Sequence, residues 1–405
     1  MPVSQVSRSI NQAISETVQK RIFFGDGDVL LNPNLAPIYV FMTRAGGRKP
    51  TGSARVEFAE DDYVTVWGQV SHGSTNQASN ITNIQVVDAT IFAVGDLIAF
   101  PNADASATAE EIARVTAVTG GTGGTLTLTR NIGGAGADTV GATADIRVVA
   151  PAYAEGAAFG TPRSTSKVVR ITYTQIVRTP VQVTYSMAAQ TQFGVSDERA
   201  YQREKAQQEH LRSLESLMIL GRASEPLASP GSIRTAMGLK SRITTNLTNG
   251  NGTLTETGFE LFAESAFSKD YHGREKLLAS APRVISALDF FSNGKVRERP
   301  LEEVHGVKVR RYGSTHGDFI VVNHKLLEDG PLGGIGLGDE AFSIDMDTVD
   351  FAYLAGNGEN WNTQLLVDVV KSGAHVYADE WVTEGSPVIR HEARSARLYN
   401  VVNFA

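Results

Sequence analysis

The sequence contains no cysteine, 14 prolines among 405 residues, and no long uncharged apolar run. Without cysteine the chain has no disulfides and no thiolate ligands for zinc or iron–sulfur clusters. No apolar stretch approaches the roughly 18 residues that indicate a membrane-spanning helix. The N-terminus also lacks the apolar core of a secretory signal peptide. These absences exclude disulfide and thiolate chemistry and predict no membrane span.

A concentrated basic patch is also missing. The formal net charge is −7, and 37 lysine and arginine residues are mixed with 44 acidic residues along the chain. Proteins that grip DNA regardless of its sequence need a basic surface that displaces counterions from the phosphates. We therefore expect no tight and no sequence-specific binding of nucleic acid.

The sequence contains fragments of catalytic and metal-binding motifs, but none is complete at the required spacing. The pair Lys240-Ser241 follows a leucine where a phosphate-binding loop requires glycine. The pair His391-Glu392 resembles the start of a zinc-protease motif, but serine stands where the second histidine is required. The remaining histidines are scattered singly. We predict no catalytic, cofactor-binding or metal-binding residues, no cofactor, and no enzymatic activity.

What the chain does contain is a long capped helix. The run SDERAYQREKAQQEHLRSLESLMILG, from Ser196 to Gly221, predicts a rod of roughly 37 Å. Ser196 is the expected N-cap, and Gly221 is expected in the left-handed position past the last turn. The first half is polar nearly all round, whereas Leu211, Leu214 and other apolar residues gather in the second half. Such a helix suits a tile in an assembly better than the core of a compact enzyme.

The segments before this helix predict one helix and many short strands. Residues 1–23 carry apolar residues at spacings of three and four, which predicts an amphipathic helix that docks on a neighbouring subunit or packs on its own domain. Strand patterns within 41–66 and at 167–173 and 181–185 predict the two legs of a long hairpin. Residues 69–155 shift to Gly, Ala, Thr, Asn and Val, with short apolar runs. They predict an inserted all-β domain, a small barrel or sandwich, at a loop tip.

The C-terminal part mixes both kinds of pattern. Helical spacing occurs at 258–271 and 282–293. Strand patterns occur at 306–314, 317–324, 341–354, 363–385 and 395–404. The last strand follows a long excursion of the chain, so we expect it to close a sheet begun elsewhere.

Two groups of opposite charge lie in the first leg of the predicted hairpin. The basic group lies in a glycine-rich loop and comprises Arg44, Arg48 and Lys49. The acidic group comprises Glu60, Asp61 and Asp62. An acidic run is by default a solvated surface, but opposite charges on two edges of one subunit suit head-to-tail contacts between copies. We predict that these two groups form an inter-subunit contact.

The run TQIVRTPVQVTYSMAAQTQFGVSDERAYQREKAQQEHLRSLESLMILGR (174–222) resembles tailed-bacteriophage major capsid proteins. In that family a strand pair leads into a polar spine helix that ends in an acidic–apolar turn and a glycine, here Ser196 through Glu215 and Gly221. The runs DMDTVDFAYL, LLVDVVKSGAHVYADEW and ARLYNV resemble the closing strands of the family. The runs VGDLIAF, ARVTAV and GTLTLTRNIGG resemble β modules inserted in phage shell proteins. The resemblance covers residues 40–66 and 157–402.

This resemblance implies an α+β fold, the Hong Kong-phage-type capsid fold that encapsulins and herpesvirus shell floors also use. The implied segments are an N-terminal arm (1–40), an extended loop or E-loop (41–68 and 156–180), the inserted all-β domain (69–155), a P-domain (181–224 and 355–405) and an A-domain (225–354). The long helix becomes the spine of the P-domain. Its polar half is expected to face solvent, the shell interior or a neighbour, and its apolar half to pack under C-terminal strands.

The resemblance implies self-assembly as the function. Hexamers and pentamers of this chain would form the icosahedral shell that encloses the double-stranded DNA of a tailed phage. The implied partners are further copies of the chain, a separate scaffolding protein, a portal and a decoration protein, with no membrane. Synthesis in the host cytoplasm and residence in the virion capsid follow from the same resemblance.

Two other interpretations remain open. An encapsulin-like nanocompartment shell shares the fold, whereas a phage tail or adhesion protein is equally β-rich but does not need the long polar helix. Polyhedral particles and their contents, seen by electron microscopy, distinguish these classes.

Overall fold

The computed structural model describes residues 36–43, 47–72, 78, 80–100, 110–134, 139–158, 160, 162–190, 197–225, 233–269, 275–292, 298–304, 307–328, 335–369 and 375–405. The helix expected at 1–23 lies outside these residues. The chain divides into two compact units, Met1–Phe58 with Arg170–Ala405, and Ala59–Val169. Helices and strands both contribute to the larger unit, so the expected α+β class is confirmed.

A seven-stranded sheet forms one half of the larger unit, in the order β11-β21-β16-β12-β15-β14-β13. Its strands are β11 (Leu247–Leu254), β12 (Glu275–Ser280), β13 (Glu298–Val304), β14 (Val307–Gly313), β15 (Asp318–Asn323), β16 (Ala341–Ile344) and β21 (Ala396–Phe404). Successive side chains of a strand point to opposite faces. Leu277 of β12 accordingly joins one buried cluster and Leu278 joins another. Both faces of the sheet are therefore covered.

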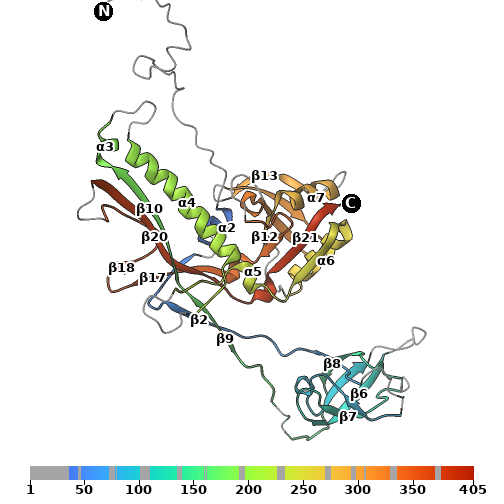
Figure 1. Cartoon of the computed structure of the whole chain (residues 1–405). Coiled ribbons are helices and arrows are strands. Elements are labelled where there is room, and N and C mark those ends of the chain that lie inside the picture. The colour runs from blue at the N-terminus through green and yellow to red at the C-terminus, as the bar shows by residue number, and fades with distance from the viewer. Residues whose placement is uncertain are drawn as a thin grey trace, which may run out of the picture. The chain divides into compact units, whose positions relative to one another are not determined.

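Helices α6 (Glu256–Phe267) and α7 (Pro282–Ser292) cover one of these faces. Figure 1 shows both helices beside β21. They correspond to the helical patterns expected at 258–271 and 282–293. Thr255 caps α6 by accepting from the backbone N–H of Gly258, and four phenylalanines of the two helices lie in one buried cluster. This face of the sheet is thus held by apolar packing.

A second sheet has the strand order β1-β17-β20-β10, with β18 beside β17 and β19 beside β20. Its strands are β1 (Arg48–Thr51), β10 (Gln175–Thr184), β17 (Val349–Gly356), β18 (Glu359–Asn360), β19 (Gln364–Leu366) and β20 (Val376–Ile389). Asn357 and Gly358, both with positive φ, join β17 to β18. Positive φ at both central residues is typical of the type I′ hairpin turn, which favours Asn-Gly.

The long helix α4 (Glu198–Leu220) lies along β10 and β20, as Figure 1 shows. Its N-cap is Asp197 and not the expected Ser196, which lies outside the described residues. The Asp197 carboxylate accepts from the N–H groups of Arg199 at 2.9 Å and of Ala200 at 3.2 Å. Serine and aspartate are both favoured N-cap residues, so the sequence alone did not decide which of these two adjacent positions caps the helix.

The expectation for Gly221 was wrong. Its backbone angles are φ −49° and ψ 145°, an extended conformation rather than the left-handed one. A Cβ at this position would lie 2.5 Å from the carbonyl oxygen of Leu217 and 2.7 Å from that of Ala236. Glycine is therefore needed here because a following segment approaches closely, and Gly238 donates its N–H to the Gly221 carbonyl at 2.9 Å.

The last strand joins the first of the two sheets. β21 pairs with β11 and β16, whereas β20 pairs with β10 and β17. The expected P-domain segment 355–405 is therefore divided between the two sheets. Hydrogen bonding between strands distant in sequence decides this division, and the sequence pattern of a strand does not specify its partner.

Within the described residues, the larger unit also has three short α-helices, and a two-stranded ribbon joins it to the smaller unit. The helices are α2 (Pro37–Phe41), α3 (Tyr185–Ala188) and α5 (Leu239–Arg242). The ribbon consists of β2 (Arg55–Glu60) and β9 (Val168–Tyr173), which correspond to the two legs of the expected hairpin.

The smaller unit, Ala59–Val169, contains a six-stranded sheet in the order β3-β8-β5-β6-β7-β4. Its strands are β3 (Trp67–Gln69), β4 (Asn83–Gln85), β5 (Asp96–Phe100), β6 (Glu111–Thr119), β7 (Thr125–Thr129) and β8 (Asp145–Pro151). The bridge between Val70 and Val86 connects the two ends of this order. The sheet is thus closed into a small barrel, which removes the exposed strand edges.

The barrel has a core of its own. Ile84, Ile98, Leu126 and Ile146 are fully buried and belong to one cluster whose residues all come from this unit. Glu111 and Arg130 form a buried ion pair, in which Arg130 Nε donates to Glu111 Oε1 at 2.8 Å. A buried core of this kind fits a unit that folds by itself.

Candidate functional site

The buried face of α4 is polar in its first half. The residues of this stripe recur every three or four positions: Arg199, Arg203, Ala206, His210, Leu214 and Met218. The expectation that the polar half faces solvent, the shell interior or a neighbour is therefore wrong for this face of the helix. Buried polar groups require partners, because leaving one unsatisfied costs about 1–3 kcal/mol. The partners come from β10, β20 and α2.

Asp379 of β20 is the anion that Arg199 and Arg203 share. Arg199 donates Nε to Oδ2 at 2.8 Å and Nη2 to Oδ1 at 2.6 Å, and Arg203 donates Nε to Oδ2 at 2.7 Å. Burial raises the pKa of Asp379, but hydrogen bonds from the two arginines and from the backbone of Asp368 lower it more, and the pKa falls well below its usual range. This carboxylate stays ionised and ties the start of α4 to the sheet.

His210 lies between two threonine hydroxyl groups. Its Nδ1 is 3.0 Å from Thr179 Oγ1 on β10, and its Nε2 is 2.7 Å from Thr383 Oγ1 on β20. The chain of hydrogen bonds continues from Thr383 to Thr363 at 2.9 Å and from Thr363 to the Tyr39 hydroxyl at 3.1 Å. Burial lowers the pKa of His210, which favours the neutral imidazole. The network connects α4 with both strands and with α2.

Glu215 holds the beginning of α2 against α4. Its Oε1 accepts the N–H of Ile38 and its Oε2 accepts the N–H of Tyr39, both at 2.8 Å. His324, which follows β15, places Nε2 2.5 Å from Glu215 Oε1. The side chains of Glu215 and His324 are both fully buried. We call this group, Glu215 with His324 and the N–H groups of Ile38 and Tyr39, the arm-root latch.

Sequence analysis missed His210, Glu215, His324 and Asp379. A signal for His210 was present, because it continues the spacing of Leu214 and Met218 toward the helix start. A polar residue on such a stripe indicates a buried hydrogen bond. Its partners come from segments distant in sequence, so spacing alone does not identify them.

The basic half of the expected inter-subunit contact is only partly described. Arg44 lies outside the described residues. Arg48, the first residue of β1, donates Nη1 to Asn362 Oδ1 at 3.1 Å, and its guanidinium carbon lies 5.5 Å from the centre of the Tyr39 ring. Arg48 thus contacts its own chain.

Lys49 forms an ion pair within the subunit. Its Nζ lies 2.7 Å from Asp350 Oδ2, and Arg390 Nη2 lies 2.7 Å from the same oxygen. The Asp350 side chain is almost completely buried, whereas more than half of the Lys49 side chain is exposed. The Lys49 charge therefore stabilises the pairing of β1 with β17.

The acidic half of the expected contact lies at the start of the smaller unit. Glu60 ends β2, and Asp61 and Asp62 are exposed. Thr165 Oγ1 lies 2.7 Å from Asp61 Oδ1 and 2.6 Å from the Asp62 carbonyl oxygen. These bonds hold the two legs of the hairpin together. Arg48 and Lys49 belong to the larger unit, so the two halves of the contact lie in different units.

The ribbon and the strand that follows it expose apolar side chains. Val168 and Val169 of β9 are 47% and 56% exposed, and Ile176 of β10 is 52% exposed. An isolated two-stranded ribbon is at best marginally stable in water. This surface is a candidate for contact with another protein chain.

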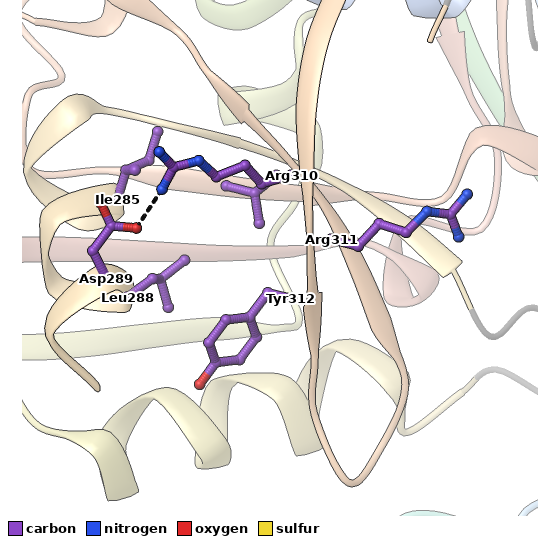
Figure 2. A pocket seen from close by; sticks show the side chains of 7 residues that line it. Ile285, Leu288, Asp289, Arg310, Arg311 and Tyr312 are labelled. Carbon is purple, nitrogen blue, oxygen red and sulfur yellow. Dashed lines mark hydrogen bonds and ion pairs between the residues drawn. The ribbon is translucent and has the colours of Figure 1, made fainter. Parts of the chain in front are cut away.

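The pocket drawn in Figure 2 is too small for a cofactor. It is lined by Ile285, Leu288, Asp289, Arg310, Arg311, Tyr312 and Val321, and its cavity volume is about 10 Å³. Such a volume holds about one water molecule. Arg310 and Asp289 form an ion pair at 2.7 Å across one side of it.

The described residues contain no group of three or more His, Asp or Glu side chains arranged to hold a metal ion. Among the helices in the described part of the chain, none is both long enough and apolar enough to cross a bilayer.

Several solved structures match the chain. The chain is similar to the capsid of a native GTA particle, with 7% identity, a TM-score of 0.46, and coverage of 98% of this chain and 99% of that chain. It is similar to a structure of Microbacterium phage Oxtober96, with 10% identity, a TM-score of 0.44, and coverage of 99% and 100%. It is also similar to the holo-SrpI encapsulin complex from Synechococcus elongatus PCC 7942, with 14% identity, a TM-score of 0.41, and coverage of 58% and 78%.

The comparison with protein families is the decisive one. No curated protein matches the chain in sequence. A family model described as the SU10 major capsid protein matches residues 14–402, which is nearly the whole chain. The expected resemblance to tailed-phage major capsid proteins is thereby confirmed. The chain belongs to the SU10 major capsid protein family and is a major capsid protein that forms the shell.

Proposed function

We propose that this capsid protein self-assembles into hexamers and pentamers, which build an icosahedral shell around the double-stranded DNA of a tailed phage. It acts by assembly and not by catalysis. The observation that carries the proposal is the exposed ribbon β2–β9, in which Val168 and Val169 of β9 are about half accessible to solvent. A second copy of the chain that covers this ribbon would bury its apolar side chains. Each Å² of apolar area removed from water stabilises the contact by roughly 25 cal/mol.

Contacts of this kind are heterologous, because the ribbon of one copy meets a different surface of the next. Repeated around an axis, such contacts close into rings. Each subunit then contacts several others, so that modest individual contacts sum through multivalency. This is the physical basis on which we propose hexamers and pentamers.

The named segments of the capsid fold are part of this proposal. We assign the N-terminal arm to residues 1–40, the E-loop to 41–68 with 156–180, and the inserted all-β domain to 69–155. The P-domain comprises 181–224 with 355–405, and the A-domain comprises 225–354. The ribbon and the barrel support the second and third assignments, whereas the pairing of β21 with β11 and β16 argues for moving the last strand to the A-domain.

The charge distribution supports enclosure of DNA without tight binding. The smaller unit holds eleven acidic and five basic residues, a formal charge of −6, which leaves −1 of the total −7 for the rest of the chain. A strongly basic wall would bind the phosphates and hinder packing and release of the genome. A nearly neutral larger unit avoids this.

Further partners complete the proposal. A separate scaffolding protein and a portal would direct assembly in the host cytoplasm, and a decoration protein would bind the finished virion. The acidic group Glu60, Asp61 and Asp62 would contact the basic group Arg44, Arg48 and Lys49 of a neighbouring copy. Lys49→Glu is unsuitable as a test, because it would place a second carboxylate beside the buried Asp350 and destabilise the subunit itself.

Electron microscopy of the purified protein tests the proposal. We expect polyhedral shells from the wild-type chain, and nucleic acid inside particles isolated from infected cells. Protein cargo in place of DNA would indicate a nanocompartment, and tubes or fibres would indicate a tail or adhesion protein. The double variant Asp61→Asn, Asp62→Asn tests the acidic contact, with Glu209→Asn on the exposed face of α4 as a control. Normal shells from the double variant would remove these residues from the contact.

A further inference from the structure

We propose that Glu215 is the positioning residue that fixes α2, the helix that residues 1–35 directly precede in the sequence, and that the arm-root latch must be closed for the chain to assemble. The inference rests on the proposed function, because it concerns the same assembly. It goes beyond that function by naming the side chain on which the position of α2 depends.

The latch joins one carboxyl group to two elements. Glu215 accepts from the N–H groups of Ile38 and Tyr39, one on each oxygen, and His324 Nε2 lies 2.5 Å from Oε1. A carboxyl group offers acceptor sites on both oxygens, whereas an amide has one oxygen and an NH₂ group that only donates. An amide side chain at this position would therefore turn an N–H donor toward one of the two backbone N–H groups.

The orientation of His324 depends on the same carboxylate. Its Nδ1 is buried and has no hydrogen-bond partner within the part of the chain that the structure describes. The bond from Nε2 to Glu215 is therefore what sets the ring orientation and the tautomer. Removing the carboxylate would leave several buried donors without acceptors, which destabilises the closed position of α2.

α2 has little stability of its own. It comprises five residues, Pro37–Phe41, and isolated helices of this length are not stable in water. Pro37 has no N–H, so Ile38 and Tyr39 are the first residues that can donate to a cap. The side chains of Ile38, Phe41 and Met42 lie in the cluster that α4 shares with both sheets. The segment is thus held by apolar packing on one side and by the latch at its start.

The position of the latch gives it a role in assembly. Residues 1–35 directly precede α2, and the sequence predicts an amphipathic pattern within them. We expect this preceding segment to contact a neighbouring copy, and a fixed α2 raises the effective concentration for that contact. Opening the latch would release residues 36–43 and weaken the contact.

Glu215→Gln tests the latch, because glutamine keeps the volume of the side chain and removes the charge. We expect trypsin to cleave after Arg48 about ten-fold faster or more than in the wild type, as for a locally opened segment. We also expect a loss of shells, while the thermal unfolding of the barrel is unchanged. Glu209→Gln, on the exposed side of the same helix, is the matched control and should behave as wild type.

A second pair of variants acts from the α2 side. Ile38→Pro removes one donated N–H at a position in the first helical turn where proline is tolerated. Ile38→Ala shortens the same buried side chain but keeps the N–H. We expect Ile38→Pro to release the segment further than Ile38→Ala. If Glu215→Gln does not fold, this comparison still tests whether the N–H donated to Glu215 holds the segment.

The proposal would be overturned if both Glu215→Gln and Ile38→Pro were cleaved by trypsin as slowly as the wild type and formed shells with wild-type yield. Failure of the wild-type chain to form shells would instead overturn the proposed function. The trypsin comparison on the unassembled subunit would still test the latch in that case, so the two failures are distinguishable.

Discussion

His210 illustrates what burial does to a single side chain in this protein. The imidazole is fully buried between the hydroxyl groups of Thr179 and Thr383. Burial lowers its pKa, because the charged form loses the hydration that it has in the unfolded chain. The pKa of Asp379 on β20 is lowered as well, but there hydrogen bonds from the two arginines of α4 outweigh the effect of burial. The contact between α4 and β20 thus favours a neutral imidazole at His210 and a charged carboxylate at Asp379.

The lowered pKa of His210 predicts a loss of stability in mild acid. As the pH falls below about 6.5, the usual histidine pKa, the unfolded chain takes up a proton before the folded chain does. The free energy of unfolding therefore decreases as the pH falls from about 6.5 toward the lower folded-state pKa. Urea unfolding of the wild type and of His210→Gln, measured between pH 5 and 8, checks this. If the free energy of unfolding changed equally with pH in the two proteins, the effect could not be assigned to His210.

At the scale of elements, α4 shows how far sequence reasoning reaches. The expected bounds 196–221 differ from the observed Glu198–Leu220 by one or two residues, because caps and apolar spacing are local signals. The roles of Gly221 and Glu215 were not foreseen. Glycine is required at position 221 because Gly238 approaches closely. Glu215 is required because it accepts N–H groups of α2. Neither Gly238 nor α2 belongs to α4 or its caps. Local patterns do not reveal such contacts.

Gly221→Ala is expected to destabilise the larger unit by about 1–3 kcal/mol, the usual cost of overpacking. The added Cβ would lie 2.5 Å from the Leu217 carbonyl oxygen and 3.0 Å from the Gly238 nitrogen. Gly356→Ala is the control, since a Cβ there meets nothing within 4 Å and the backbone has no positive φ. Thermal unfolding of both variants measures the difference. A Gly221→Ala variant as stable as Gly356→Ala would show that the two backbones separate easily.

At the scale of the whole molecule, the chain consists of two units with separate cores. The sequence pattern predicted the strands of the smaller unit and its all-β class, because each run is short and bounded by turn residues. It left barrel and sandwich open, since closure depends on the bridge between Val70 and Val86. The last strand was expected to close a sheet begun elsewhere, but its partners β11 and β16 were not predicted, for the same reason. Strand partners are chosen by tertiary packing.

The fragment Ala59–Val169 is expected to fold alone and to unfold in one cooperative transition. Its buried cluster is complete within the fragment, and its sheet has no open edge. Circular dichroism and calorimetry of the isolated fragment measure this. Ile98→Asp, which places a carboxylate in the core, is the control that should abolish the transition. A fragment that melts gradually would mean that the barrel depends on the rest of the chain.

The two ends of the barrel lie next to each other. Its first strand, β3, pairs with its last, β8, in the register Trp67 with Arg147, and Thr165 bonds to Asp61 just outside it. A module whose ends meet can be removed or exchanged for another without changing the length of the ribbon that carries it. This geometry makes the barrel portable in evolution, and it makes the same junction a position for displaying foreign domains on engineered particles.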